Sequence, residues 1–199
     1  MATGSHLRIG ILVFDDVEEL DVVGPYEVLS MWAEYSDLRP QVVIFSPDGL
    51  GVRCAKGLRI VPDHGADDVG PLHVLVHPGG RGTRALATDS AHLEWVRSMR
   101  ATTPLMTSVC TGALVFAAAG LLAGRPATTH WRAFDELAAL DPSVLADTAA
   151  RFVDDGDVIT SAGVSAGIDM ALHLVARLDS PEAARAVRRG IQYDPAPPV

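Results

Sequence analysis

The sequence predicts an α/β fold, in which a mostly parallel sheet is flanked by helices on both faces as a three-layer sandwich. Two observations support this prediction. Short apolar runs rich in β-branched residues alternate along the chain with longer stretches of helical periodicity. The chain also has 199 residues, of which 48% are hydrophobic and 21% charged, so it can build one domain around a substantial core.

The first half of the chain contains two predicted buried strands, a helix and a hairpin. The strands cover residues 8–14 and 41–45. Between them, Gly24-Pro25 is expected to open a helix, because proline is favoured in the first helical turn. Residues 52–54 and 58–61 flank a Lys-Gly pair, a pattern that predicts a hairpin.

The second half continues the alternation of strands and helices. Strands are predicted over 73–76 and 105–109, and helices over 90–101 and 112–122 follow them. The other predicted elements are a helix over 131–140, a hairpin made by 152–153 and 158–160, and helices over 166–178 and 181–189. Residues 1–6 contain Gly-Ser-His and are expected to be a disordered tag remnant, which leaves 7–199 as a single domain.

Composition excludes several classes of protein. A net charge of −9 and a pI of about 5.1 argue against a nucleic-acid ligand. The longest apolar run, 112–124, is too short to span a bilayer, and no export signal precedes the first strand. The only cysteines, Cys54 and Cys110, exclude a disulfide scaffold and suit the reducing cytoplasm. The histidines lack metal-ligand spacing, so we expect no metal and no cofactor.

Ligands of parallel sheets bind beyond the carboxyl ends of the strands, and Cys110 stands at such a position. Ser108 and Gly112, two residues to either side, are small, which is the pattern of a nucleophile elbow. The following helix N-terminus is expected to stabilise a thiolate. An anion formed on a substrate would meet the N–H of Thr111 and an N–H of Gly79-Gly80. The alternative for Cys110 is a small buried core cysteine, which is the role expected for Cys54.

Several segments resemble the ThiJ/PfpI superfamily, which is glutamine-amidotransferase-like in fold, consistent with a flavodoxin-like sandwich. The longest and most specific is 108–131 (SVCTGALVFAAAGLLAGRPATTHW). The other matching segments are 9–14, 20–29, Pro78-Gly79-Gly80, 161–169 and 192–198. Within the superfamily the chain is similar to two branches, the isonitrile hydratases and the ligand-sensing domains of AraC-type regulators.

The hydratase branch implies conversion of small isonitriles to N-substituted formamides. Cys110 is the implied nucleophile, which adds to the terminal carbon to give a thioimidate-type adduct. Asp21 matches the family's Leu-Asp-x-x-Gly-Pro acid and is the implied general acid and base, with a pKa raised by burial beside the thiol. From the residues alone, a helix N-cap ahead of Gly24-Pro25 is the favoured role for Asp21. The rival carboxylates are Asp15, Asp16, Glu18 and Glu19, of which Glu19 ranks first.

Three further residues are candidates for the site. Thr111 stands where the protease-like branch has a histidine, which removes the base of a Cys–His peptidase. The resemblance implies that Thr111 bonds substrate or water, and the alternative is a bond within the first helical turn. His130 lies in a segment that the family places beside the cysteine. Its two possible roles are contact with a ligand and a structural, hydrogen-bonded histidine. His77 replaces the usual apolar residue before Gly79 and Gly80, where it is expected to reach the pocket and alter its polarity or the thiol's pKa.

Three functional hypotheses follow. The first is a cysteine-dependent isonitrile hydratase. The second is a non-catalytic domain that senses a ligand or responds to oxidation through its thiol, although the chain shows no DNA-binding segment after residue 189. The third is a glyoxalase- or amidase-like enzyme that uses the same thiol. The resemblance also implies a homodimer that acts on a small-molecule substrate.

Overall fold

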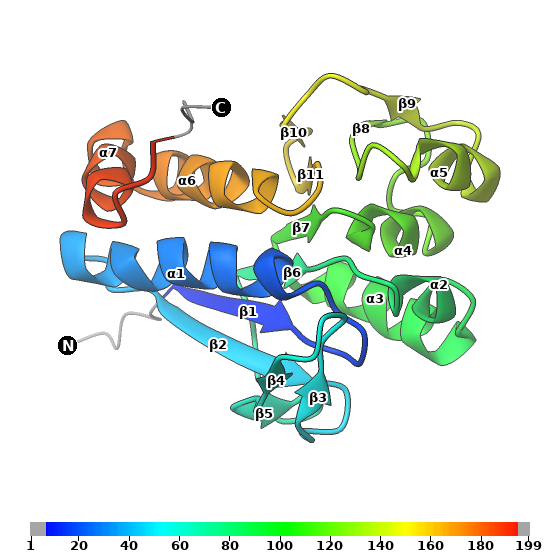
Figure 1. Ribbon diagram of the computed structural model, residues 1–199, viewed down its shortest axis with the longest axis horizontal. Coiled ribbons are helices and arrows are strands. Elements are labelled where there is room, and N and C mark those ends of the chain that lie inside the picture. Colours follow the sequence, from blue (N-terminus) through cyan, green and yellow to red (C-terminus); the bar gives the residue numbers. More distant parts are fainter. Residues whose placement is uncertain (1–6, 195–199) are drawn as a thin grey trace.

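The computed structural model describes residues 7–194, and the predicted tag remnant at 1–6 lies outside them. A seven-stranded sheet forms the centre, and all of its neighbouring strands are parallel except β10 and β11 (Figure 1). In spatial order the strands are β10 (Phe152–Asp154), β11 (Val158–Ser161), β7 (Leu105–Val109), β6 (Val74–His77), β1 (Arg8–Leu12), β2 (Gln41–Ser46) and β5 (His64–Gly65). The predicted α/β architecture is therefore confirmed.

The helices form the two outer layers of the sandwich. One layer contains α1 (Glu19–Tyr35), α6 (Ala166–Leu178) and α7 (Pro181–Gly190), which pack against one another. The other contains α2 (Thr83–Leu86), α3 (Ser90–Thr102), α4 (Gly112–Ala118) and α5 (Phe134–Leu140) (Figure 1). Crossovers between parallel strands are right-handed, so the direction in which the chain crosses the sheet decides which face the connecting helix covers. The chain moves from β1 to β2 in one direction and from β6 through β7 to β11 in the other, so the connecting helices cover opposite faces.

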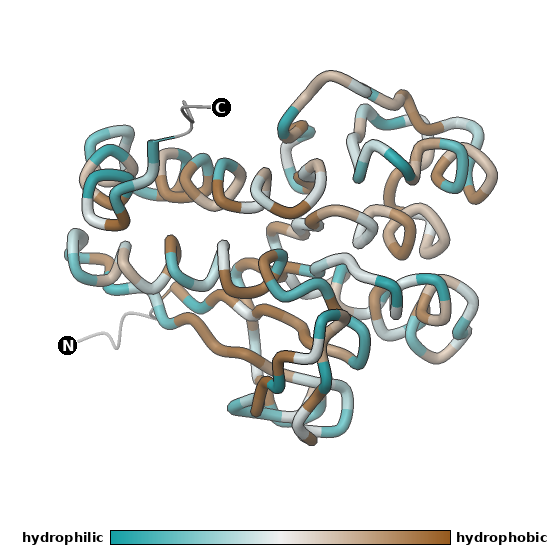
Figure 2. Tube along the Cα trace, in the orientation of Figure 1, coloured by the Kyte–Doolittle hydropathy of each residue, from teal (hydrophilic) through white to brown (hydrophobic). Residues whose placement is uncertain are grey.

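The hydrophobic residues gather along the central strands and on the inner sides of the helices (Figure 2). Ile9 and Ile11 of β1, Met106 of β7 and Phe116 of α4 are fully buried. Parallel strands that are covered on both faces need such continuous apolar runs, which is why the sequence pattern located them. Within the described residues, no helix has the length and apolar character to cross a membrane.

Two small sheets lie outside the central one. β3 (Val52–Arg53) and β4 (Arg59–Ile60) pair in antiparallel fashion and confirm the predicted hairpin. β8 (Pro126–Ala127) and β9 (Leu145–Ala146) pair in parallel and were not predicted. Two-residue strands have no measurable periodicity, so only tertiary contacts reveal them.

The predicted start of α1 is wrong. The helix begins at Glu19, and Pro25 lies inside it rather than in its first turn. The lost N–H of Pro25 is tolerated because the earlier start buries Asp21 and Val22, and the Pro25 ring then packs beside Gly167 of α6. The N-cap residue is Glu18, so the interpretation of Asp21 as the N-cap is also wrong.

The apolar helix after Cys110 is shorter than predicted. Helix α4 ends at Ala118, and Gly120 follows with a φ of 83°, a left-handed conformation that stops the helix. In the remainder of the apolar run, Ala119, Leu121 and Leu122 are buried in turns instead. Hydrophobicity alone therefore identified a buried segment correctly but not where its helix stops.

Candidate active site

Cys110 forms the turn that joins β7 to α4. Its φ is 57°, which is uncommon for a residue with a side chain and confirms the strained elbow. Its backbone N–H donates to the carbonyl oxygen of Ser161 at 3.0 Å, and this bond ties the elbow to the end of β11. Only 6% of Cys110 is exposed, so the residue is almost completely removed from solvent.

The glycines around the elbow allow two backbone segments to touch. A Cβ atom on Gly79 would lie 2.5 Å from the amide nitrogen of Thr111 and 2.7 Å from Cβ of Cys110. A Cβ atom on Gly112 would lie 2.3 Å from the carbonyl oxygen of His77. These distances are too short for any other residue, so the Pro78-Gly79-Gly80 turn packs directly against the elbow.

We expect the Gly112→Ala substitution to destabilise the protein by about 1–3 kcal/mol, because its methyl group overlaps the His77 carbonyl and the backbone has to move. The free energy of unfolding in urea measures the effect. Gly51→Ala is the matched control, since its Cβ would lie 3.4 Å from the nearest atom, the carbonyl oxygen of Ile60. An equal loss of stability in the two variants would contradict the close approach at the elbow.

Asp21 lies beneath the thiol as a fully buried carboxyl group on α1. Its Oδ2 accepts the N–H of Gly79 at 2.9 Å, and its Oδ1 accepts the N–H of Val164 at 3.2 Å. Burial raises the pKa of Asp21 to about 7 and outweighs the opposing effect of the Gly79 hydrogen bond. Asp21 therefore changes protonation near neutral pH, as a general acid and base requires.

The thiol of Cys110 forms a coupled pair with Asp21. A hydrogen bond between the two side chains lowers the pKa of the carboxyl and raises that of the thiol. Burial and then the Asp21 charge raise the pKa of Cys110 to about 12, so the resting group is a thiol. The expectation of a resting thiolate is therefore wrong, because desolvation outweighs the hydrogen bonds from Thr111. Above pH 7 the pair therefore holds one proton, which lies on sulfur, and below pH 7 Asp21 is protonated as well.

Thr111 connects the elbow to the glycine turn. Its Oγ1 accepts the N–H of Gly80 at 2.9 Å and lies 3.0 Å from Oγ1 of Thr83. The N–H groups of Gly79 and Gly80 therefore already have partners in Asp21 and Thr111. Hydrogen bonds from the backbone and hydroxyl of Thr111 lower the pKa of the Cys110 thiol and oppose the effect of burial. In this state the anion-stabilising contact comes from Thr111, while the glycine amides hold the acid and the threonine in place.

His130 stands beside the elbow, where the resemblance places it. The hydroxyl of the preceding Thr129 donates to the carbonyl oxygen of Cys110 at 2.8 Å. The His130 ring is half-buried against Gly163, at which a Cβ atom would lie 2.2 Å from the ring. Burial and then the charges of Arg132 and Arg84 lower the pKa of His130, so the ring is neutral at pH 7. A neutral imidazole there can donate or accept a hydrogen bond at the rim of the site.

His77, the last residue of β6, lies in the core rather than in the site. Its Nδ1 lies 2.9 Å from the carbonyl oxygen of Pro78, and its Nε2 lies 3.1 Å from Nε2 of His92. Burial and then His92 lower the pKa of His77 to about 3, so the ring stays neutral. Complete burial leaves no surface of His77 for a substrate, so the expectation that it reaches the pocket is wrong.

Two contributors to the site were missed from the sequence. Val164 has a φ of 57°, which turns its N–H toward Asp21, and Gly163 makes room for His130. Both residues lie in the segment 161–169 that carries the family resemblance, but nothing in its residue types indicated a backbone donor to Asp21. The other cysteine, Cys54, is buried, and burial with nearby carboxylates raises its pKa to about 11. Within the described residues, no group of three His, Cys, Asp or Glu side chains is arranged to hold a metal.

The fold and this site together define an α/β protein with a cysteine at a nucleophile elbow and a buried carboxyl beside it. The family model described as the DJ-1/PfpI family matches residues 7–177. The chain belongs to the DJ-1/PfpI family, also written ThiJ/PfpI, which confirms the resemblance.

Three relatives illustrate the range of the family. The isonitrile hydratase of Pseudomonas putida is 41% identical over 192 residues, which cover 96% of this chain and 81% of the relative. A crystal structure of a ThiJ/PfpI family protein from Pseudomonas syringae has a TM-score of 0.88 at 35% identity, covering 98% of this chain and 78% of that one. The HTH-type transcriptional regulator GbdR of Pseudomonas aeruginosa is 29% identical over 187 residues, 94% of this chain but only 50% of the regulator.

Proposed function

We propose that the protein hydrates small isonitriles to N-substituted formamides at Cys110. The observation that carries this proposal is the pairing of the elbow thiol of Cys110 with the fully buried carboxyl of Asp21, whose pKa is raised to about 7. The 41% identity to an isonitrile hydratase over nearly the whole chain supports it.

The first half of the proposed reaction forms a covalent adduct. Asp21 takes the proton of the Cys110 thiol as sulfur attacks the terminal carbon of the isonitrile. The carboxyl group then delivers that proton to the same carbon. The product is a thioimidate, with a new S–C bond, a new C–H bond and a carbon–nitrogen double bond, and Asp21 is again a carboxylate.

The second half releases the formamide. Asp21 removes a proton from water as the water oxygen attacks the thioimidate carbon. The Asp21 carboxyl group then protonates the thioimidate nitrogen. Collapse of the tetrahedral adduct breaks the S–C bond and forms the formamide carbonyl. The hydroxyl proton leaves through Asp21 and returns to sulfur, so one water is consumed for each isonitrile. Thr111, which already hydrogen-bonds the sulfur, steadies the charge that develops there.

A homodimer in the cytoplasm is the expected setting of this reaction. Leu20, Val23 and Tyr26 of α1 are large hydrophobic residues that stay exposed in the single chain, and they flank Asp21 on the same helix. Exposed apolar groups of this kind favour contact with a second copy. The two free thiols fit a reducing compartment.

The direct test incubates the protein with cyclohexyl isonitrile and with an aryl isonitrile, and follows the formamide proton by NMR. We expect catalytic formation of the N-substituted formamide, well above the rate without protein. Single or absent turnover of either compound would overturn the hydratase proposal. It would favour instead the ligand-sensing or redox-responsive role represented by the regulator relative.

A further inference from the structure

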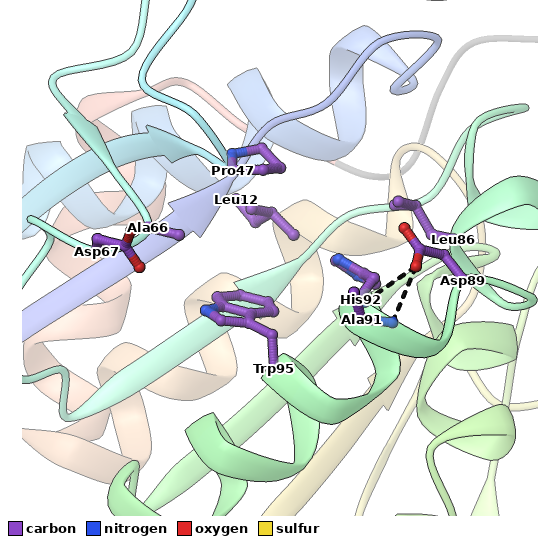
Figure 3. A pocket seen from close by; sticks show the side chains of 9 residues that line it. All are labelled: Leu12, Pro47, Ala66, Asp67, Leu86, Asp89, Ala91, His92 and Trp95. Carbon is purple, nitrogen blue, oxygen red and sulfur yellow. Dashed lines mark hydrogen bonds between the residues drawn. The ribbon is translucent and has the colours of Figure 1, made fainter.

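A separate cavity lies at the carboxyl edge of the sheet, on the face that α3 covers (Figure 3). It encloses about 270 Å³ between the end of β1, the segments after β2 and β5, and the start of α3. Its lining does not include Cys110, Asp21 or Thr111. The cavity is thus distinct from the site of the proposed reaction, and its volume suits a molecule of a single ring.

The position of the cavity in the fold favours a ligand. The two neighbours of β1 are β2 and β6, and the chain runs to them in opposite directions. In open α/β sheets such a reversal leaves a crevice beyond the carboxyl ends of the strands, where ligands bind. Leu12 at the end of β1 forms part of the cavity wall at that crevice.

The wall combines flat apolar groups with negative charge. The Trp95 ring lies beside the His92 ring, with their centroids 5.4 Å apart, and Leu12 and Leu86 add aliphatic surface (Figure 3). Asp67 and Asp89 supply two carboxylates at the cavity, and no lysine or arginine lines it. One oxygen of Asp89 accepts the N–H groups of Ala91 and His92, while Asp67 makes no hydrogen bond to another described residue.

His92 adds another acceptor rather than a donor. Because a carbonyl oxygen only accepts, Nδ1 of His77 carries the hydrogen that bonds Pro78, and Nε2 of His77 is an acceptor. Nε2 of His92 must then donate to it, which leaves Nδ1 of His92 unprotonated. His92 is only 8% exposed, and among the bonds of the described residues none reaches that nitrogen. Burial also lowers the pKa of His92, and the ring stays neutral.

The ionisable side chains of the cavity wall, Asp67, Asp89 and His92, are thus all acceptors, and the indole N–H of Trp95 is the one side-chain donor on the wall. The charged groups that line the cavity are Asp67, after β5, and Asp89, before α3, and both are negative. A ligand that matches this wall has a hydrocarbon body for Trp95 and Leu12 and a positively charged donor for the carboxylates. We propose that the cavity binds a small organic ammonium ion with one apolar ring. This binding does not depend on the reaction at Cys110.

The test follows the indole N–H signals of the ¹⁵N-labelled full-length protein by NMR, with the Trp95→Phe variant to assign the Trp95 signal. Benzylammonium is the probe, and benzyl alcohol and benzoate are the matched neutral and negative probes. We expect benzylammonium to shift the Trp95 signal to saturation with a Kd of about 1 mM or tighter. Benzyl alcohol should bind at least about 5-fold more weakly, and benzoate should not bind.

Matched variants locate the interaction. Asp67→Asn should weaken benzylammonium about 2- to 5-fold, whereas Asp68→Asn, at a neighbouring carboxylate outside the cavity wall, should not change it. Ala66→Leu, which fills the cavity, should abolish the saturable shift. Cys110→Ala should bind as the wild type does, which separates this cavity from the thiol site. No saturable shift of Trp95, equal affinity for benzyl alcohol, or equal effects of Asp67→Asn and Asp68→Asn would overturn the proposal.

Discussion

The Cys110→Ala variant is expected to lose isonitrile hydration by at least about 10³-fold while remaining folded, because no other group at the elbow can form the covalent adduct. Alanine fits the space and accepts the same backbone geometry, so the midpoint of thermal unfolding should change little. The initial rate of formamide formation, measured by NMR, tests the prediction.

Cys54→Ala is the matched control for this experiment. Cys54 is the other free cysteine and is also buried, but it follows β3 and makes no contact with Asp21 among those described. We expect its hydration rate to stay within about twofold of the wild type. Equal losses in the two variants, or full activity in Cys110→Ala, would exclude a thiol mechanism at the elbow.

The Asp21→Asn variant is expected to separate catalysis from thiol reactivity. The hydration rate should fall about 10²- to 10⁴-fold, because asparagine neither accepts nor delivers the proton. Alkylation of Cys110 by iodoacetamide at pH 8 should become faster, because the Asp21 charge and hydrogen bond are two of the causes that raise the thiol's pKa. Mass spectrometry of the Cys110 peptide separates this alkylation from that of Cys54.

A purely structural Asp21 gives a different outcome. If the carboxylate served only to hold Gly79 and Val164, both the hydration rate and the alkylation rate would follow the loss of native structure. Parallel changes in the two rates would therefore contradict the catalytic role. Opposite changes, with activity falling and alkylation rising, would support it.

The same carboxyl group makes stability depend on pH. The folded-state pKa of Asp21 is raised from 3.8 to about 7, so between these values the folded protein holds a proton that the unfolded chain has lost. The free energy of unfolding therefore falls as pH rises through this window, by an amount of the order of 4 kcal/mol for this group. The difference between wild type and Asp21→Asn in urea unfolding at pH 4 to 8 measures it. A difference that stays constant with pH would contradict the raised pKa.

The elbow was predictable because its signals are local. Ser108 and Gly112 are small, Cys110 ends a strand, and an apolar helix follows, all within a few residues. The strand β7 and the helix α6 have the predicted bounds for the same reason. A continuous apolar run identifies the strand, helical periodicity identifies the helix, and both patterns can be recognised within a short segment of sequence. The start of α1 was predicted wrongly because Pro25 favours a helix start at its own position. Packing against α6 stabilises a helix that begins earlier, at Glu19.

The role of Asp21 illustrates what the sequence left open. Read locally, the residue is a helix cap, and only the family resemblance suggested an acid. The structure brings it to the N–H groups of Gly79 and Val164, which are far from it along the chain, and removes it from water. Its pKa near 7 arises from that desolvation, which no spacing of residues along the chain encodes.

The sequence by itself determined the α/β class, the positions of the main strands along the chain, the cysteine elbow and the family, because these depend on local periodicity and on motifs of a few residues. The tertiary structure alone decided the protonation of the Cys110–Asp21 pair, the burial of His77 and the partners of the Gly79 and Gly80 amides. Solvent exclusion and hydrogen bonding set these properties, and both depend on which distant segments meet at the carboxyl edge of the sheet.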